Sequence, residues 1–317
     1  KVMCELKRTT GEKKMPNPDN MERFGYTVLQ KPLEALNMVF PVEEGELDDT
    51  SISDLVGQGG LSRMMTFKNR KNYEYRDGVE EKFGRIFAES EIPKYSAKIS
   101  AICDAVLSSE GICLVYSQYL DGGLIPIALA LEERGCQRFG GNSLMKSVPG
   151  KKTAIKYVMI TGDKDLSPNN SLAVKKVSDD GNKDGDEIKI ILISRAGTEG
   201  LDFKNIRQVH ILEPWYNTNR LEQTIGRAVR TCSHIKLPFS KRNVMIFFYA
   251  SLLKGSDEAA DMYVYRVAEM KAVLIGKVSR ALKEGAVDCL LNSEQMNTTV
   301  ELMKQTKRIR LANGKYI

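Results

Sequence analysis

The chain has 317 residues, of which 42% are hydrophobic and 28% charged, the balance of an ordinary globular protein with room for about two domains. Its formal net charge of +6 comes from 47 Lys+Arg against 41 Asp+Glu and points only weakly to polyanionic partners. No apolar run approaches the roughly 18 residues that a membrane span requires, and the first residues lack a signal-peptide core. The six cysteines contain no C-x-x-C pair, which argues against a zinc knuckle or a secreted disulfide framework and predicts an intracellular, reducing compartment.

Residues 1–92 alternate short apolar patches with Pro-, Gly- and acid-rich stretches and show no sustained helical or strand period. We therefore expect an irregular, accessory segment here. Its stretch FKNRKNYEYR interleaves basic residues with Tyr73 and Tyr75, a composition that suits stacking on nucleic acid. A solvated loop is the more common meaning of such a charge run, and we favour it.

Residues 93–254 have the pattern of a layered α/β domain. The segment YSAKISAICDAVLSSEG places apolar residues at helical spacing and ends at Gly111. Short apolar runs then alternate with helical patterns: ICLVYS, YVMITG, IKIILIS, VHILE and NVMIFFYA. Such runs are typical of buried parallel strands. We predict an α/β fold, with a parallel sheet covered by helices on both faces and an appended helical element over residues 255–317.

The segment TNRLEQTIGRAVRTC gives two opposed stripes when it is placed on a helical wheel. Gln223, Arg227 and Arg230 share one side, and the other side is apolar: Leu221, Ile225, Ala228, Val229 and Cys232. Two planar guanidinium groups held in parallel suit a phosphoryl group, because charge builds on its oxygens as it is transferred. Two arginines on a helix are more often a solvated basic face, so the neighbouring segments decide the interpretation.

A glycine-containing loop, SRAGTEGLDF, follows the run IKIILI, which is where α/β folds place ligand loops. Gly197 and Gly200 allow a close approach of the backbone to a ligand. Ser194 and Thr198 carry hydroxyls suited to a nucleic-acid phosphate, and Asp202 can accept from a ribose hydroxyl or position the arginines. Taken alone, such a loop is more often a simple turn.

In their order and spacing, SRAGTEGLDF and QTIGRAVR resemble motifs V and VI of superfamily 2 helicases. The run EPWYN before the arginine segment is similar to one in Swi/Snf-type ATPases, and LVYSQYLDGGL looks like motif IV. More narrowly, KYSAKI, HILEPWYN, AVRTCSH and AVDCLLN resemble the helicases of nucleocytoplasmic large DNA viruses, a group that includes the early-transcription ATPase subunit of poxviruses and its asfarvirus and giant-virus counterparts. The resemblance covers about residues 93–292 and implies a RecA-like C-terminal motor lobe, with residues 1–92 as an inter-lobe segment and residues 255–317 as a helical extension.

The resemblance also implies roles for individual residues. Arg227 and Arg230 would be arginine fingers that reach ATP, bound with Mg²⁺ in another lobe, and Gln223 would be their partner. Gly200 and Asp202 would contact the nucleotide. Ser117, Ser194 and Thr198 would lie near the backbone of DNA or RNA. The protein would then belong to an ATP-dependent translocase or helicase of viral transcription, working in the virion or the host cytoplasm.

Two elements of such a motor are missing from the sequence. The nearest match to a phosphate-binding loop, VPGKKTA, has Met145 where the first glycine should stand and no strand before it. No acidic pair follows an apolar strand in the manner of a magnesium-binding Walker B motif. We therefore expect no ATP hydrolysis by the chain alone. The ATPase lobe would be supplied by the same full-length chain, shortened here by truncation, a gene split or an incomplete gene model, or by a separate subunit.

Two other functions remain open at this point. A degenerate motor lobe can serve as a non-catalytic scaffold that binds nucleic acid or a transcription complex, and the arginine pair can belong to an unrelated α/β enzyme that binds a phosphorylated metabolite. Among the remaining residues, His210 and Cys232 are predicted to lie in the core. Trp215 and Tyr216 are expected to pack against the following helix rather than to line a nucleotide cleft.

Overall fold

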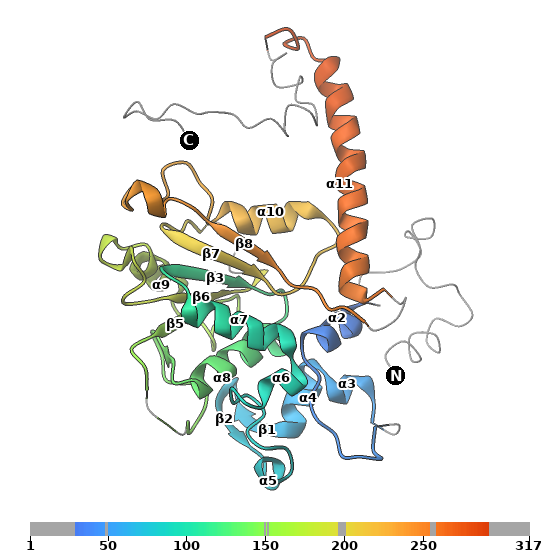
Figure 1. Ribbon diagram of the computed structural model, residues 1–317, viewed down its shortest axis with the longest axis vertical. Helices are drawn as coiled ribbons and strands as arrows, with labels where there is room; N and C mark the ends of the chain where they lie inside the picture. The colour runs from blue at the N-terminus through green and yellow to red at the C-terminus, as the bar shows by residue number, and fades with distance from the viewer. Residues whose placement is uncertain are drawn as a thin grey trace, which may run out of the picture. The chain divides into compact units, whose positions relative to one another are not determined.

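The computed structural model describes residues 29–47, 50–148, 150, 152–195, 201–253 and 258–291 (Figure 1). The chain divides after Val267 into two compact units. The boundaries expected near residues 92 and 254 do not separate compact units, because the segments on both sides of each belong to the first unit.

The first unit is built on a six-stranded sheet with the strand order β4-β5-β6-β3-β7-β8. Every neighbouring pair is parallel, as the continuous apolar runs predict. The strands are β3 (Ile112–Tyr116), β4 (Gln137–Arg138), β5 (Lys156–Ile160), β6 (Ile190–Ile193), β7 (Ile206–Ile211) and β8 (Met245–Phe248). The central strand β3 places Val115 opposite Leu192 on one side and His210 on the other.

Helices cover both faces of this sheet, which confirms the α/β architecture of a RecA-like lobe (Figure 1). On one face, Cys113 and Val115 share a core with α7 (Ala97–Ser108) and α8 (Ile125–Glu133). On the other, Leu114 and Tyr116 share a core with α9 (Asn170–Val177) and α10 (Thr218–Gly226). Alternate residues of a strand point to opposite faces, so the side chains of β3 contribute to the hydrophobic cores on both faces of the sheet.

The helix predicted before the first strand is present as α7. Its N-cap is Ser96, whose hydroxyl accepts from the Ile99 amide at 3.0 Å and donates to the carbonyl of Asn37. Ile99, Ile102 and Cys103 are fully buried, as the helical spacing predicts. The cap thus begins the helix and also ties it to a segment about 60 residues earlier in the chain.

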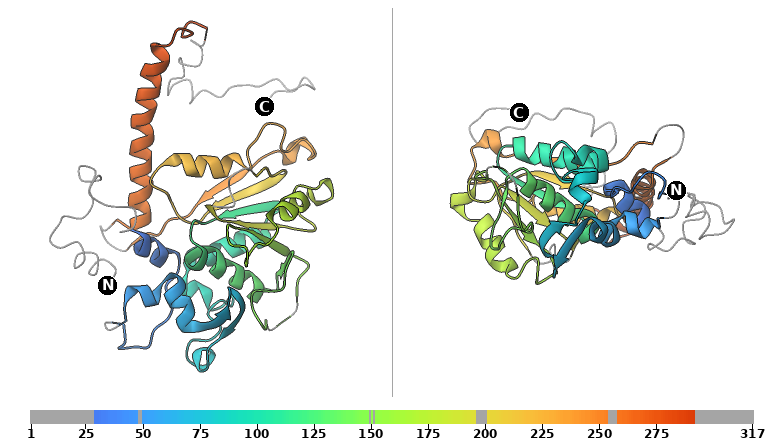
Figure 2. Two further views of the ribbon diagram at one scale, coloured as in Figure 1. Left: turned by 180° about the vertical axis from the view of Figure 1, so that it is seen from behind. Right: turned by 90° about the horizontal axis from the view of Figure 1, so that it is seen from below.

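The segment before α7 is more regular than expected (Figures 1 and 2). It contains α2 (Gln30–Asn37), α3 (Ile52–Leu55), α4 (Gly57–Met64), the hairpin of β1 (Met65–Lys68) and β2 (Lys71–Tyr75), α5 (Val79–Phe83) and α6 (Ile92–Tyr95). Phe40, Leu61 and Met65 are buried in the same core as α7 and α8. Tyr73 and Tyr75 are buried as well, with 0% and 9% of their surface exposed, so they are core residues and form no stacking surface.

The first unit also contains three short helical turns, and one long helix continues past Val267 into the second unit. The turns are the π-helix η2 (Leu120–Leu124) and the 3₁₀ helices η3 (Asp180–Asn182) and η5 (Phe239–Lys241). The helical element expected toward the C-terminus is present as α11 (Ala260–Glu284), and Asp261, Val264 and Val267 of its first turns are buried. No helix in the described ranges is long and apolar enough to cross a membrane.

Candidate functional site

The carboxyl ends of the parallel strands bring two of the predicted site residues, Ser117 and Ser194, to one edge of the sheet. Ser117 directly follows β3, Ser194 directly follows β6, and Glu213 comes two residues after the end of β7. In open α/β sheets this edge is where ligands bind. Gly200 and Thr198, also predicted to belong to the site, lie outside the described residues.

The segment that carries Arg227 and Arg230 is helical only in its first part. Helix α10 ends at Gly226, where the predicted helix continues through Cys232. The chain tightens there because the amides of Arg227 and Ala228 bond to carbonyls only three residues back, a common way for a helix to end. Arg227 and Arg230 therefore lie in a turn, from which Ala228 points into the core with no exposed surface.

The same turn corrects two apolar positions of the wheel. Val229 is 52% exposed, and Cys232 is exposed in the left-handed backbone region at φ 62°. Neither residue anchors the segment to the core, although Leu221 and Ala228 do. Gln223 is exposed, on the side of the helix away from Leu221.

Both arginines reach the segment that follows the glycine loop. Arg227 donates through Nη1 to the carbonyl of Leu201 at 2.9 Å. Arg230 pairs through Nη1 with Oδ1 of Asp202 at 3.2 Å, and both side chains are about half exposed. The two predicted motifs thus meet on an open edge, where a guanidinium held by one exposed carboxylate remains accessible to a phosphate.

The hydroxyl of Ser117 has a different role from the predicted one. The residue is fully buried, and its hydroxyl donates to the carboxylate of Glu213 at 2.9 Å. A buried hydroxyl that is already bonded cannot contact a nucleic-acid backbone, so the expectation for this side chain is wrong. Ser194 is also largely buried, with 5% exposed, and its amide donates to the Ile160 carbonyl at 3.1 Å.

Glu213 is the functional candidate that the sequence interpretation missed. Its carboxylate lies in the core and also accepts from the Gln118 amide at 2.6 Å and from Asn37 Nδ2 at 2.9 Å. Burial raises the pKa of Glu213 to about 7, although the hydrogen bonds from Gln118, Ser117 and Asn37 each lower it. An acid directly after the apolar run VHIL is the signal that points to it, because acids are seldom buried without partners.

A buried ion pair lies in the same part of the unit. Lys98 Nζ is 2.7 Å from Oδ2 of Asp261, and their side chains are only 6% and 0% exposed. Asp261 also accepts from the amides of Ser251 and Met262. These bonds join α7, the chain after β8 and the first turn of α11, so polar contacts hold together segments that are far apart in the sequence.

Of the two aromatic residues before α10, Trp215 contacts the following helix as predicted, and Tyr216 packs elsewhere. The guanidinium of Arg220 lies 3.7 Å from the centre of the Trp215 ring, a cation–π contact. Tyr216 is buried against Leu29 and Val264.

His210 is a core residue, as predicted: its ring nitrogens bond to Tyr249 and Gln208, and burial lowers its pKa to about 4. In the part of the chain described, no three His, Cys, Asp or Glu side chains form a group that could hold a metal ion.

Comparison with known proteins shows the family to which this chain belongs. Residues 97–232 match the helicase conserved C-terminal domain. A protein named as a helicase in Invertebrate iridescent virus 3 is 31% identical over 234 residues, which is 70% of this chain and 23% of the relative. One named as an ATP-dependent RNA helicase in Acanthamoeba polyphaga mimivirus is 39% identical over 137 residues, 41% of this chain and 17% of the relative. A homologue of termination factor NPH-I in African swine fever virus is 29% identical over 315 residues, 87% of this chain and 44% of the relative.

These matches confirm the resemblance to the C-terminal lobe of superfamily 2 helicases from large DNA viruses. The chain spans less than half the length of each of these relatives. Among solved structures, the C-terminal part of the Fun30 ATPase domain aligns with a TM-score of 0.46 and 13% identity, covering 84% of this chain and 82% of that one.

Proposed function

We propose that this chain is the second motor lobe of an ATP-dependent nucleic-acid translocase or helicase. In this proposal, Arg227 and Arg230 are arginine fingers for ATP and Mg²⁺, which are held mainly by an N-terminal ATPase lobe of the full-length chain or of a separate subunit. The observation that carries the proposal is the meeting of Arg230 and Asp202 on an open edge, with Arg227 bonded to the adjacent Leu201 carbonyl. Gln223, exposed on α10, would support the arginines, and Gly200 would contact the nucleotide.

The nucleic-acid track would lie at the carboxyl edge of the sheet, where Ser194 follows β6. Thr198, whose hydroxyl suits phosphate oxygens, and Ser194 would both lie near the nucleic-acid backbone. DNA and RNA both fit this chemistry. The similarity to termination factor NPH-I homologues supports a role in the transcription machinery of a large DNA virus, in the virion or the host cytoplasm.

The test is ATP hydrolysis by the complete motor, in which this chain is joined to its N-terminal lobe. Arg227→Ala and Arg230→Ala should each lower nucleic-acid-stimulated kcat by about 10³-fold, since arginine fingers act on the transition state. Affinity for nucleic acid should stay near that of the unaltered motor. Arg280→Ala, which removes an exposed arginine paired only with Glu284 of its own helix, is the matched control and should leave kcat unchanged.

Other outcomes would favour a different function. Full turnover by the Arg227→Ala motor would contradict the finger assignment. A complete motor that binds nucleic acid but hydrolyses no ATP would support the alternative, a non-catalytic scaffold. The isolated chain should bind nucleic acid without turning over ATP, and turnover by the isolated chain that disappears on Arg227→Ala would contradict the need for a second lobe.

A further inference from the structure

The tip of the β1–β2 hairpin holds Arg70 in an unusual backbone conformation. Lys68 pairs with Lys71, so Asn69 and Arg70 form a two-residue loop, with φ of 49° and 52°. Two positive φ angles are the pattern of a type I′ turn, which favours asparagine and then glycine. A side chain such as arginine at the second position costs about 1 kcal/mol of backbone strain. Such strain persists where the surrounding contacts outweigh it.

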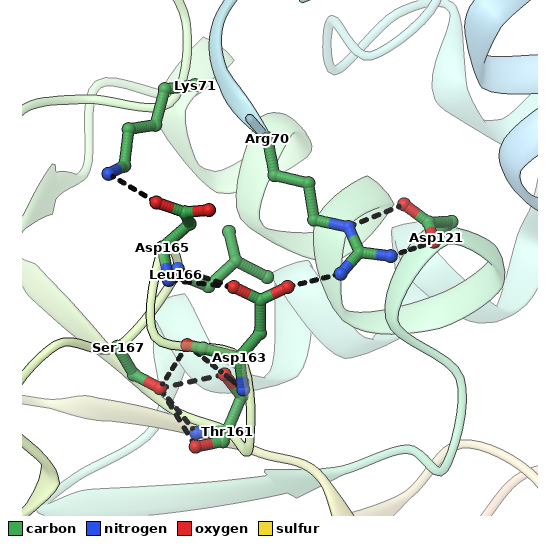
Figure 3. A network of polar contacts seen from close by, with 8 residues as sticks. All are labelled: Arg70, Lys71, Asp121, Thr161, Asp163, Asp165, Leu166 and Ser167. Carbon is green, nitrogen blue, oxygen red and sulfur yellow. Dashed lines mark hydrogen bonds and ion pairs between the residues drawn. The ribbon is translucent and has the colours of Figure 1, made fainter. Parts of the chain in front are cut away.

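Those contacts are ion pairs from the Arg70 guanidinium to Asp121 and Asp163, which belong to two other segments (Figure 3). This cluster of three side chains is called the fork below. Arg70 donates to both carboxylate oxygens of Asp121, through Nε at 3.3 Å and Nη2 at 2.8 Å. Its Nη1 donates to Oδ2 of Asp163. Asp121 belongs to η2, after β3, and Asp163 to the loop after β5. The three side chains are 14% to 27% exposed, so the pairs are shielded from most of the solvent.

The loop that carries Asp163 is itself tightly bonded. Oδ1 of Asp163 accepts from the amides of Asp165 and Leu166 at 2.8 and 3.2 Å, which leaves Oδ2 for Arg70. Ser167 joins Thr161 through its hydroxyl, which accepts from the Thr161 amide at 2.9 Å. Burial alone would raise the pKa of Asp163, but the Leu166 amide, Arg70 and the Asp165 amide outweigh it and keep the pKa below its usual value.

The charges around Arg70 argue against a direct contact between its guanidinium and a phosphate. One guanidinium faces two carboxylates, so its charge is already balanced and is not offered to a phosphate. The two loops that it joins follow β3 and β5 at the carboxyl edge of the sheet, the edge assigned above to nucleic acid. The joining residue comes from the segment before the matched domain, which begins at residue 97.

We propose that Arg70 is a positioning residue for nucleic-acid binding: it holds η2 and the loop of residues 161–167 at a fixed separation, so that this edge fits a phosphodiester backbone. This inference rests on the function proposed above. Arg70 does not touch the nucleic acid. Its removal therefore loosens the two loops and weakens binding, while the number of phosphate contacts stays the same.

The experiment compares two substitutions that remove the same charge from the same hairpin. Arg70→Gln breaks the fork, and Lys71→Gln breaks only the exposed pair with Asp165 at 3.3 Å. The probe is a fluorescein-labelled single-stranded DNA, or the RNA of the same sequence, titrated with the full chain at several salt concentrations. Arg70→Gln should weaken binding about tenfold, and Lys71→Gln by about twofold or less, because half-exposed ion pairs contribute little.

The salt dependence separates positioning from direct contact. With a single-stranded probe, removing a residue that contacts a phosphate lowers the magnitude of the slope of log K against log salt by about 0.7. The slope for Arg70→Gln should equal that of the unaltered chain. A slope whose magnitude is lowered by about 0.7, or equal weakening by Arg70→Gln and Lys71→Gln, would overturn the proposal.

Amide hydrogen exchange tests the fork without any nucleic acid. In Arg70→Gln, exchange at Asp165 and Leu166 should become faster, and Asp121→Asn added to it should have little further effect, because Asp121 acts on that loop through Arg70. Unchanged exchange would overturn the positioning role by itself. If the unaltered chain fails to bind either probe while exchange responds as expected, the assignment of this edge to nucleic acid fails and the fork stands as a structural feature.

Discussion

Glu213→Gln is expected to change how the stability of the chain depends on pH. The pKa of Glu213 is raised from 4.5 to about 7 in the folded chain, so its proton is bound more tightly folded than unfolded. The stability that this proton contributes is fully present below about pH 4.5 and is lost as the pH rises through about 7. The linkage relation gives a loss of about 2 kcal/mol in the free energy of unfolding between about pH 5.5 and about pH 8.

The assay is urea unfolding of the unaltered chain and of the variant at both pH values. Glutamine has nearly the same shape and cannot ionise, so the stability difference between the two proteins should shift by about 2 kcal/mol between the two pH values. Any constant cost of placing an amide beside Asn37 cancels in this comparison. Asp163→Asn is the control: because the pKa of Asp163 is lowered in the folded chain, the pH-dependent part of its effect lies at acid pH, and its stability difference from the unaltered chain should be the same at both pH values. A shift below about 0.5 kcal/mol for Glu213→Gln would refute the reasoning.

Two further predictions concern the packing beside Ser117, the partner of Glu213, and the buried ion pair of Lys98 with Asp261, and both are measured by urea unfolding. In Gly123→Ala the new Cβ would lie 2.2 Å from Ser117 Oγ, so we expect a loss of about 1–3 kcal/mol. Gly226→Ala, whose Cβ meets nothing within 4 Å, should change stability by less than about 0.5 kcal/mol, and equal effects would contradict the packing argument. Lys98→Ala leaves the buried Asp261 carboxylate unpaired and should cost about 3–5 kcal/mol, and adding Asp261→Leu should recover part of the loss. A loss below about 1 kcal/mol would show that water solvates the pair.

The sheet could be predicted because its strands are buried on both faces. Runs such as IKIILI and VHILE are apolar without alternation, which distinguishes central parallel strands from half-exposed ones. The two-residue strand β4 could not be found in this way, since it is too short to show a pattern. The same holds for the helices α3, α5 and α6, of four or five residues each, whose order comes from tertiary packing, such as that of α6 against α7, rather than from local propensity.

The candidate site could be predicted in part. The motifs pointed to Arg227, Arg230 and Asp202, whose segments the structure brings into contact, but a helical wheel assumes that the helix continues. It could not show that α10 ends at Gly226, because the end depends on bonds made only three residues back. The role of Ser117 was misjudged for a related reason. Its partner, Glu213, is almost 100 residues away in the sequence, and only the pairing of β3 with β7 brings the two together.

The shared core before and after residue 97 has a practical consequence for the expression of this lobe. A fragment cut to the matched residues 97–232 would lose Phe40, Leu61 and Met65, which cover the α7 and α8 side of the sheet. It would also lose β8, so that β7 would become an edge strand. Both changes expose apolar or unpaired surface to water and favour aggregation. Fragments intended for solution work should therefore begin before Leu29 and extend beyond Val267.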